Sequence, residues 1–151
     1  MSAELTTTEK QETALQLHSR GFNCSQAVCA ALAPDLGFTR EEALRVSAAL
    51  GGGIGRSGAT CGAVMGALLA LGMKYGMTEA DPQAKERMYT LAQEYMARFA
   101  ERHGALTCKG LLNADISTVE GRQSMKERNT HATVCTGVVQ DAVAIAEDML
   151  Q

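Results

Sequence analysis

Apolar residues recur every three or four positions along most of the chain, which predicts amphipathic α-helices. Capping residues such as Asn23 and Thr39 mark where helices begin, and Gly21, Pro34 and Gly104 mark where they end. The stretches predicted to be helical are 8–20, 23–33, 39–50, 60–75 and 82–103, a short segment at 108–114, another that starts with a capping box at 117–120, and a last helix beginning near 130–133.

The stretch 60–75 differs from the others because it is apolar all round, as in a helix buried at the centre of a domain. Gly58, Gly62, Gly66 and Ala70 repeat every four residues, and such a row of small side chains lets another helix approach closely. We therefore predict an all-α fold, formed by a single domain over residues 1–151. It should be an irregular bundle of about six helices around this buried Gly/Ala-rich helix.

The composition agrees with a helical bundle. Hydrophobic residues make up 46% of the chain and aromatic residues only 4%, with no tryptophan, so the core has to be aliphatic. Alanine, leucine and methionine favour helices, and the β-branched residues that a large sheet needs are few. The net charge of −3 supplies no basic surface for a phosphate backbone, so we expect no nucleic-acid partner.

No segment has the pattern of a secretory signal or a membrane span. Residues 1–12 are polar, and the longest uncharged run, 57–73, is short and rich in glycine. We therefore expect a cytoplasmic protein without a stable membrane span, in a compartment where thiols stay reduced. Because the predicted central helix is so apolar, we also expect a homodimer that completes its burial across a two-fold interface.

Four cysteines, Cys24, Cys61, Cys108 and Cys135, share one local context, because each follows a capping residue by one or two positions. We predict that all four lie in the first turn of a helix, where unpaired N–H groups and the helix dipole lower the pKa of a thiol. Thiolate is the form that attacks disulfides and binds metals. The fifth cysteine, Cys29, lies about 140° around the helix from Cys24 among alanines, so we predict that it only packs in the core.

The same four cysteines are therefore the candidate catalytic, cofactor-binding and metal-binding residues, and three hypotheses remain open for them. The first is an iron–sulfur cluster or another thiolate-bound metal that exchanges electrons with an unknown redox partner. The second is metal-free thiol–disulfide chemistry between pairs of these cysteines. The third is a helical binding module without redox activity, in which each cysteine is a small buried apolar residue. Because no Cys-x-x-Cys pair occurs, a metal site requires distant helices to converge.

The glycine-rich segment 53–58 reads Gly-Ile-Gly-Arg-Ser-Gly, which has the G-x-G-x-x-G form of a dinucleotide-binding turn. Such a turn follows a β-strand, whereas a capped, alanine-rich helix precedes this one, so we do not expect a Rossmann fold. Two interpretations remain for the segment. It forms an anion site from Gly53, Gly55 and Arg56, or it forms a tight turn that delivers Cys61, and we favour the turn.

The histidines add one candidate. His131 lies four residues before Cys135 and would share its side of a helix, where it could activate that cysteine or bind beside it. We favour a solvated position for His131 at the start of a helix. The other two histidines are isolated. His18 belongs to the apolar stripe of the first helix, and His103, next to Gly104, is typical of a helix C-terminus, where the helix dipole favours it.

Several motifs resemble those of one protein family. They are Phe-Asn-Cys-Ser-Gln-Ala at 22–27, Gly-Gly-Gly-Ile-Gly-Arg at 51–56, Cys-Gly-Ala-Val-Met-Gly at 61–66, and the lone Cys108 and Cys135. The pattern is similar to that of the C_GCAxxG_C_C family of redox-active proteins, which is named for it, and it extends from about residue 10 to 145. The resemblance implies that the four cysteines, without Cys29, form a redox site. The family is also similar to the non-haem part of split-Soret cytochrome c, which implies an iron–sulfur site, although this chain has no Cys-x-x-Cys-His motif for haem.

Overall fold

The computed structural model describes residues 4–151, so residues 1–3 of the predicted domain 1–151 lie outside the described part. The helices are α1 (Thr7–Ser19), α2 (Cys24–Leu32), α3 (Arg40–Val46), α4 (Gly51–Ile54), α5 (Gly62–Tyr75), α6 (Pro82–His103), α7 (Cys108–Leu112), α8 (Val119–Glu127) and α9 (Thr136–Met149), with 3-10 turns at Pro34–Leu36 and Ala48–Leu50 and a π-helical turn at His131–Cys135. Within the described residues the β-structure consists of one isolated bridge, between Thr60 and Thr107, so the predicted all-α class is confirmed. None of the described helices is both long and apolar enough to cross a membrane.

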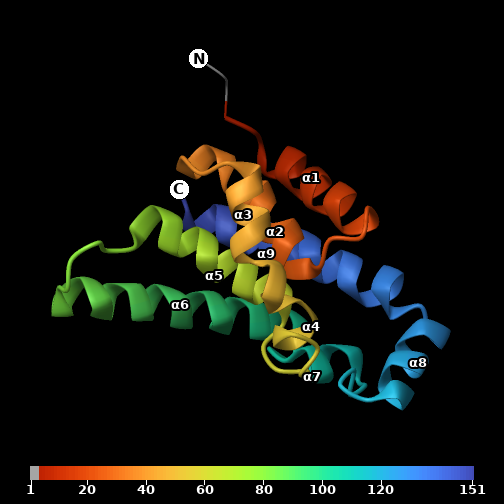
Figure 1. The fold of residues 1–151 in the computed structure, drawn as a ribbon. Helices are drawn as coiled ribbons and strands as arrows, with labels where there is room; N and C mark the ends of the chain where they lie inside the picture. The colour runs from red at the N-terminus through yellow and green to blue at the C-terminus, as the bar shows by residue number, and fades with distance from the viewer. Residues whose placement is uncertain (1–3) are drawn as a thin grey trace.

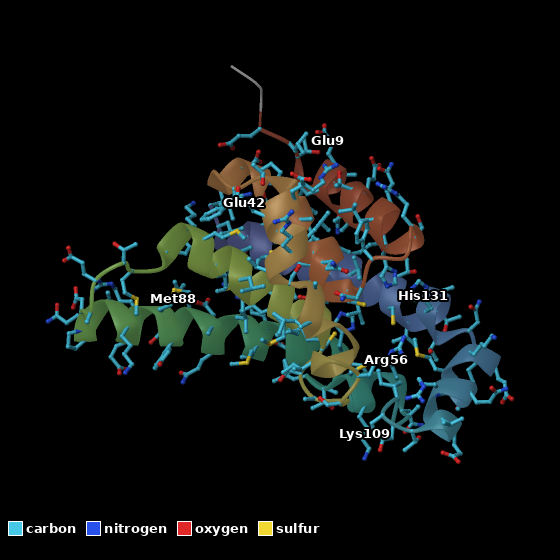
Figure 2. The ribbon with its side chains drawn as sticks, viewed as in Figure 1. Glu9, Glu42, Arg56, Met88, Lys109 and His131 are labelled. Atoms are coloured by element: carbon cyan, nitrogen blue, oxygen red, sulfur yellow. The ribbon has the colours of Figure 1, made fainter. Side chains whose placement is uncertain are left out.

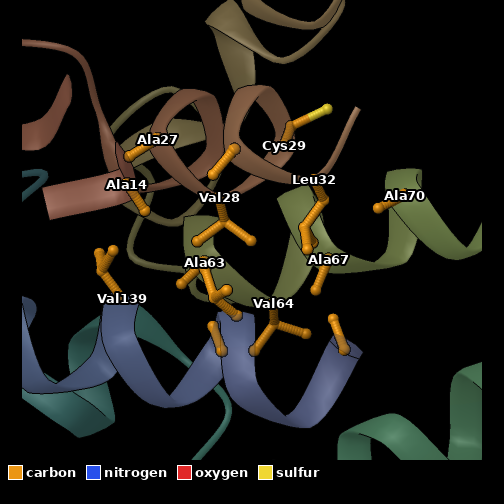
Figure 3. Packing of buried hydrophobic residues seen from close by; sticks show 14 of the residues in the cluster. Ala14, Ala27, Val28, Cys29, Leu32, Ala63, Val64, Ala67, Ala70 and Val139 are labelled. Carbon is orange, nitrogen blue, oxygen red and sulfur yellow. The ribbon is translucent and has the colours of Figure 1, made fainter. Parts of the chain in front are cut away.

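The helices α2, α5 and α9 form the centre of the bundle (Figure 3). Val28 from α2, Val64 from α5 and Val139 from α9 are fully buried there. Helix α1 packs on α2 and α9, while α6 packs on α5 and α9 and runs along the lower left of the bundle in Figure 1. The predicted arrangement around a buried Gly/Ala-rich helix is confirmed, since α5 is that helix.

The small residues of α5 allow its backbone to touch α2. A Cβ atom added at Gly66 would lie 2.5 Å from the carbonyl oxygen of Ser25 and 3.1 Å from the backbone nitrogen of Cys29. One added at Gly62 would lie 3.1 Å from the backbone nitrogen of Ser25. The predicted close approach of two helices is therefore confirmed. Cys29 itself is fully buried in this core, as predicted.

Some predicted helix boundaries are wrong. The third helix ends at Val46 rather than at Leu50, and a separate 3-10 turn covers the last residues of the predicted stretch. The cap of α8 is Thr118, whose side chain accepts a hydrogen bond from the N–H of Gly121, rather than Ser117, whose hydroxyl donates to Asp115. Short helices such as α4, α7 and α8 also raise the number of helical segments above the predicted six.

Candidate functional site

All four predicted site cysteines line one cavity of about 680 Å³. They reach it from four different parts of the chain: Cys24 begins α2, Cys61 precedes α5, Cys108 begins α7, and Cys135 ends the π-helical turn before α9. Cys29 does not line this cavity. The structure thus brings together the four cysteines that share a local context and leaves the fifth in the core.

A single β-bridge joins the segments that carry Cys61 and Cys108. Thr60 and Thr107 pair in antiparallel fashion, and two backbone hydrogen bonds flank them. The N–H of Cys61 donates to Leu106 at 2.7 Å, and the N–H of Cys108 donates to Ala59, also at 2.7 Å. The side chain of Thr107 then caps α7 by accepting from Gly110 at 2.9 Å. Because the bridge fixes both backbones, the two thiols face the cavity from adjacent positions.

The glycine-rich segment holds this bridge in place. Residues 52–56 all have φ between +60° and +67°, so the chain makes a left-handed turn here, which only glycine adopts without strain. The N–H of Ala59 donates to the carbonyl of Gly53 at 2.9 Å, which ties the turn to the bridged segment. A Cβ atom on Gly53 would lie 2.7 Å from the Cβ atom of Cys108. These contacts match the predicted tight turn that delivers Cys61.

The anion site predicted at Gly53, Gly55 and Arg56 stays a prediction. The N–H groups of Gly55 and Arg56 both donate to the carbonyl of Gly51, so they are engaged within the turn. Gly55 and Arg56 line the cavity, whereas Gly53 does not. An anion bound there would therefore have the Arg56 guanidinium as its donor in this segment.

Cys24 and Cys135 form a hydrogen-bonded pair of thiols. Asn23 and Gln26 make a reciprocal capping box that begins α2 at Cys24, as the sequence predicts. The thiol of Cys24 donates to the sulfur of Cys135, which lowers the pKa of Cys135 and raises the pKa of Cys24 well above its ordinary value. Burial raises the pKa of Cys24 further. Of this pair, Cys135 is therefore the cysteine that ionises more easily.

The prediction that helix N-termini lower the pKa of all four thiols is wrong. Burial raises the pKa of Cys61 to about 11, although the N–H groups of Ala63 and Val64 oppose this rise. Burial and the neighbouring thiols raise the pKa of Cys108 to about 12. Cys135 does not lie in a first turn, because the π-helical turn from His131 continues directly into α9. Removal from water outweighs the helix dipole at Cys61 and Cys108, whereas at Cys24 the hydrogen bond with Cys135 makes the larger contribution and burial adds to it.

Comparison with protein-family models matches residues 22–149, which include all four cavity cysteines, to the family described as "Putative redox-active protein (C_GCAxxG_C_C)". The chain belongs to the C_GCAxxG_C_C family. No curated protein and no solved structure matches it. The family is described as redox-active, which agrees with four cysteines around one cavity.

Two charged side chains also line the cavity of this C_GCAxxG_C_C protein, and both are cationic. They are Arg56 and Arg122, and none of the described residues that line the cavity has a carboxylate. Arg122 also donates to the carbonyl of Ile116 at 2.9 Å, which orients its side chain. Figure 2 shows Arg56 and His131 at the end of the bundle where α7 and α8 lie. The charged side chains at the cavity are therefore positive, although the whole chain has a net charge of −3.

Sequence reasoning missed His18. Its Nε2 atom lies 3.5 Å from the sulfur of Cys24, and its ring stacks on that of His131 at 4.0 Å with an interplanar angle of 9°. Burial and the proximity of His131 lower the pKa of His18 to about 4. His131 is exposed, as we favoured, and its ring stacks on His18. Residues 20–23 lie between α1 and α2 and separate His18 from Cys24, so helical spacing gave no signal for this contact.

Among the residues that the structure describes, no three His, Cys, Asp or Glu side chains are grouped closely enough to hold a single metal ion. The four cavity thiols are nevertheless near enough to interact electrostatically. In each pair, the negative charge of one ionised thiol raises the pKa of the other. They therefore surround a shared space without converging on one point.

Proposed function

We propose that the four cysteines Cys24, Cys61, Cys108 and Cys135 hold an iron–sulfur cluster and that the protein transfers electrons. The observation that carries this proposal is their common position around one cavity, with mutual repulsion between every pair of ionised sulfurs. Membership of a family described as redox-active supports it.

The donor set and the dimensions of the site fit such a group. Four cysteine thiolates are the usual ligands of both [2Fe–2S] and [4Fe–4S] clusters. A single zinc ion requires its sulfurs at about 2.3 Å from one centre, and the described side chains make no such group. In a [4Fe–4S] cluster each cysteine binds a different iron, so the four ligand sulfurs stand farther apart than those around a single ion. The cavity of about 680 Å³ has room for it.

The protein's own residues stabilise the charge that this site requires. Four thiolates in a buried site repel one another, which agrees with the raised pKa values of Cys61 and Cys108. The N–H groups of Ala63 and Val64 at the start of α5 offset part of this rise at Cys61, and the cationic side chains of Arg56 and Arg122 line the same cavity. When bound, a cluster would supply one-electron oxidation and reduction at a potential set by charge, hydrogen bonds and exposure.

Protein purified without oxygen should therefore contain iron and acid-labile sulfide, and its visible absorption should bleach on reduction. Reconstitution with ferrous iron and sulfide should restore the colour of a metal-free sample. Wild-type protein that stays colourless and iron-free after reconstitution would contradict the proposal.

A second candidate is thiol–disulfide exchange, favoured by the hydrogen bond between Cys24 and Cys135 and their opposite pKa shifts. The Cys135 thiolate would attack a disulfide in a partner protein and form a mixed disulfide, releasing one partner thiolate. Cys24 would then lose its proton and attack the Cys135 sulfur, which releases the second partner thiolate and leaves an intramolecular disulfide. Iron-free protein that loses two thiols on mild oxidation, with Cys24 and Cys135 joined, would support this candidate.

Other expectations from the sequence stay predictions. These are a single domain over 1–151, a homodimer, a cytoplasmic location and a separate redox partner. The non-redox alternative, a binding module that uses Gly53, Gly55 and Arg56 for an anion, also stays a prediction. Full function after replacement of all four cavity cysteines would favour that alternative.

A further inference from the structure

His18 is a buried polar group that contacts the candidate site without belonging to the cysteine pattern. Its side chain extends from the last turn of α1, and the residue is only 4% exposed. The Nε2 atom lies 3.5 Å from the sulfur of Cys24, within the range of a hydrogen bond to sulfur. A buried imidazole so placed must either donate to this sulfur or accept from it.

The chemistry of Cys24 decides the direction of this hydrogen bond. A thiol has one hydrogen, and the raised pKa of Cys24 together with the lowered pKa of Cys135 corresponds to a Cys24 thiol that donates this hydrogen to the Cys135 sulfur. The side of the Cys24 sulfur that faces His18 therefore presents lone pairs. If Cys24 is instead a thiolate bound to iron, it has no hydrogen at all. In both states Nε2 must carry the proton and donate it.

The neighbouring ring holds His18 in this orientation. His131 stacks on it with ring centroids 4.0 Å apart and an interplanar angle of 9°. His131 begins the π-helical turn that ends at Cys135, so the stack joins the segment before Cys24 to the segment before its thiol partner. π-Helical turns of this kind are frequent at functional sites.

We propose that His18 is a positioning residue that donates an Nε2–H hydrogen bond to the Cys24 sulfur and thereby raises the reduction potential of the site. This inference rests on the proposed redox role of Cys24. Hydrogen bonds to ligand sulfurs are among the determinants of iron–sulfur potentials. Reduction adds negative charge to the sulfurs, so a donor stabilises the reduced state more than the oxidised state.

The tautomer of His18 tests the geometry in wild-type, metal-free protein. Long-range proton–nitrogen correlation NMR should show Nε2 protonated and Nδ1 bare. A His18 ring protonated only at Nδ1 would overturn the inference, whatever the metal content of the protein, because such a ring cannot donate to Cys24. This readout does not depend on electron-transfer activity.

The reduction potential tests the consequence. His18→Leu keeps an apolar side chain and removes the donor, so it should shift the equilibrium about tenfold toward the oxidised state, which lowers a one-electron potential by about 59 mV. His18→Gln places an amide donor near the same position and should restore most of the shift. His103→Gln, a substitution outside the residues that line the cavity, should leave the potential unchanged. Equal potentials for wild type and His18→Leu would overturn the inference.

These outcomes separate the inference from the proposed function. If the reconstituted wild type contains no iron, the cluster proposal fails. The reduction potential of the Cys24–Cys135 disulfide is then compared between the wild type and the same variants. A donor to Cys24 should raise that potential too, since it stabilises the reduced sulfur. If His18→Leu shifts the reduction potential of neither the cluster nor the disulfide, His18 only packs against Cys24.

Discussion

Replacing Gly53 by alanine should damage both the stability of the fold and the cysteine site. Gly53 has φ +67°, and a Cβ atom there would lie 2.7 Å from the backbone nitrogen and oxygen of Ala59 and 2.7 Å from the Cβ atom of Cys108. Two of these atoms belong to the backbone that forms the β-bridge. Relief of the contacts therefore requires the bridged segment to move, and Cys108 to move with it.

Gly55 provides a matched control in the same turn. Its φ is +60°, but a Cβ atom there would meet nothing nearer than the Ala49 oxygen at 3.9 Å. Gly55→Ala should therefore cost only the strain of a left-handed alanine, about 1–2 kcal/mol. Gly53→Ala should add an overpacking cost of about 1–3 kcal/mol to the same strain. The difference between the two variants isolates the close approach to Ala59 and Cys108.

Urea unfolding followed by far-UV circular dichroism would measure both costs. For a chain of this size each kcal/mol lowers the melting temperature by about 2–4 °C, so the two variants should be distinguishable by heat as well. Alkylation of Cys108 in the folded, metal-free protein should be faster in Gly53→Ala than in Gly55→Ala. Equal loss of stability in the two variants, with equal alkylation, would refute the proposed packing of the turn against the site.

Three further predictions concern packing, pH and assembly. Gly66→Ala should destabilise the fold by about 1–3 kcal/mol through overpacking against Ser25. Gly72→Ala in the same helix should stabilise the fold by about 1 kcal/mol, because a Cβ atom there meets nothing within 4 Å. If urea unfolding showed Gly66→Ala to be the more stable variant, the close contact of α2 and α5 would be contradicted. The metal-free protein should lose stability as the pH rises from about 9 to about 11, because the unfolded chain releases the Cys61 proton before the folded chain does. Cys61→Ala should lose less over that window, and equal losses would disprove the assignment. Sedimentation at micromolar concentration should show a homodimer, and a single 16.0 kDa species would count against it.

Much of the fold follows from local signals in the sequence. Asn23, Thr39 and Thr107 cap helices where their side chains and spacing predict it. The glycine row predicted the contact of α5 with a neighbouring helix, because small residues at a four-residue spacing lie on one helix face. Signals of this kind act within one or two turns, so a single sequence contains them.

The electrostatics of the site depend on contacts between distant segments and could not be predicted in this way. A helix N-terminus alone would lower the pKa of Cys61, but its burial, which results from the packing of the whole domain, raises it. The hydrogen bond between Cys24 and Cys135 joins α2 to the start of α9. The stack of His18 on His131 spans a similar separation in the chain. No local pattern encodes such contacts, although the shared context of the four cysteines did select the correct four for the cavity.

The iron content of five variants, each with one cysteine replaced, tests the central claim most directly. Each variant, Cys24→Ser, Cys61→Ser, Cys108→Ser, Cys135→Ser and Cys29→Ala, would be reconstituted without oxygen and its iron and sulfide measured per folded chain. If four cysteines hold one cluster, the first four variants should lose most of the iron, and Cys29→Ala should retain the wild-type amount. Retention of iron in any two of the cavity variants, or loss of it only in Cys29→Ala, would contradict a shared four-cysteine site.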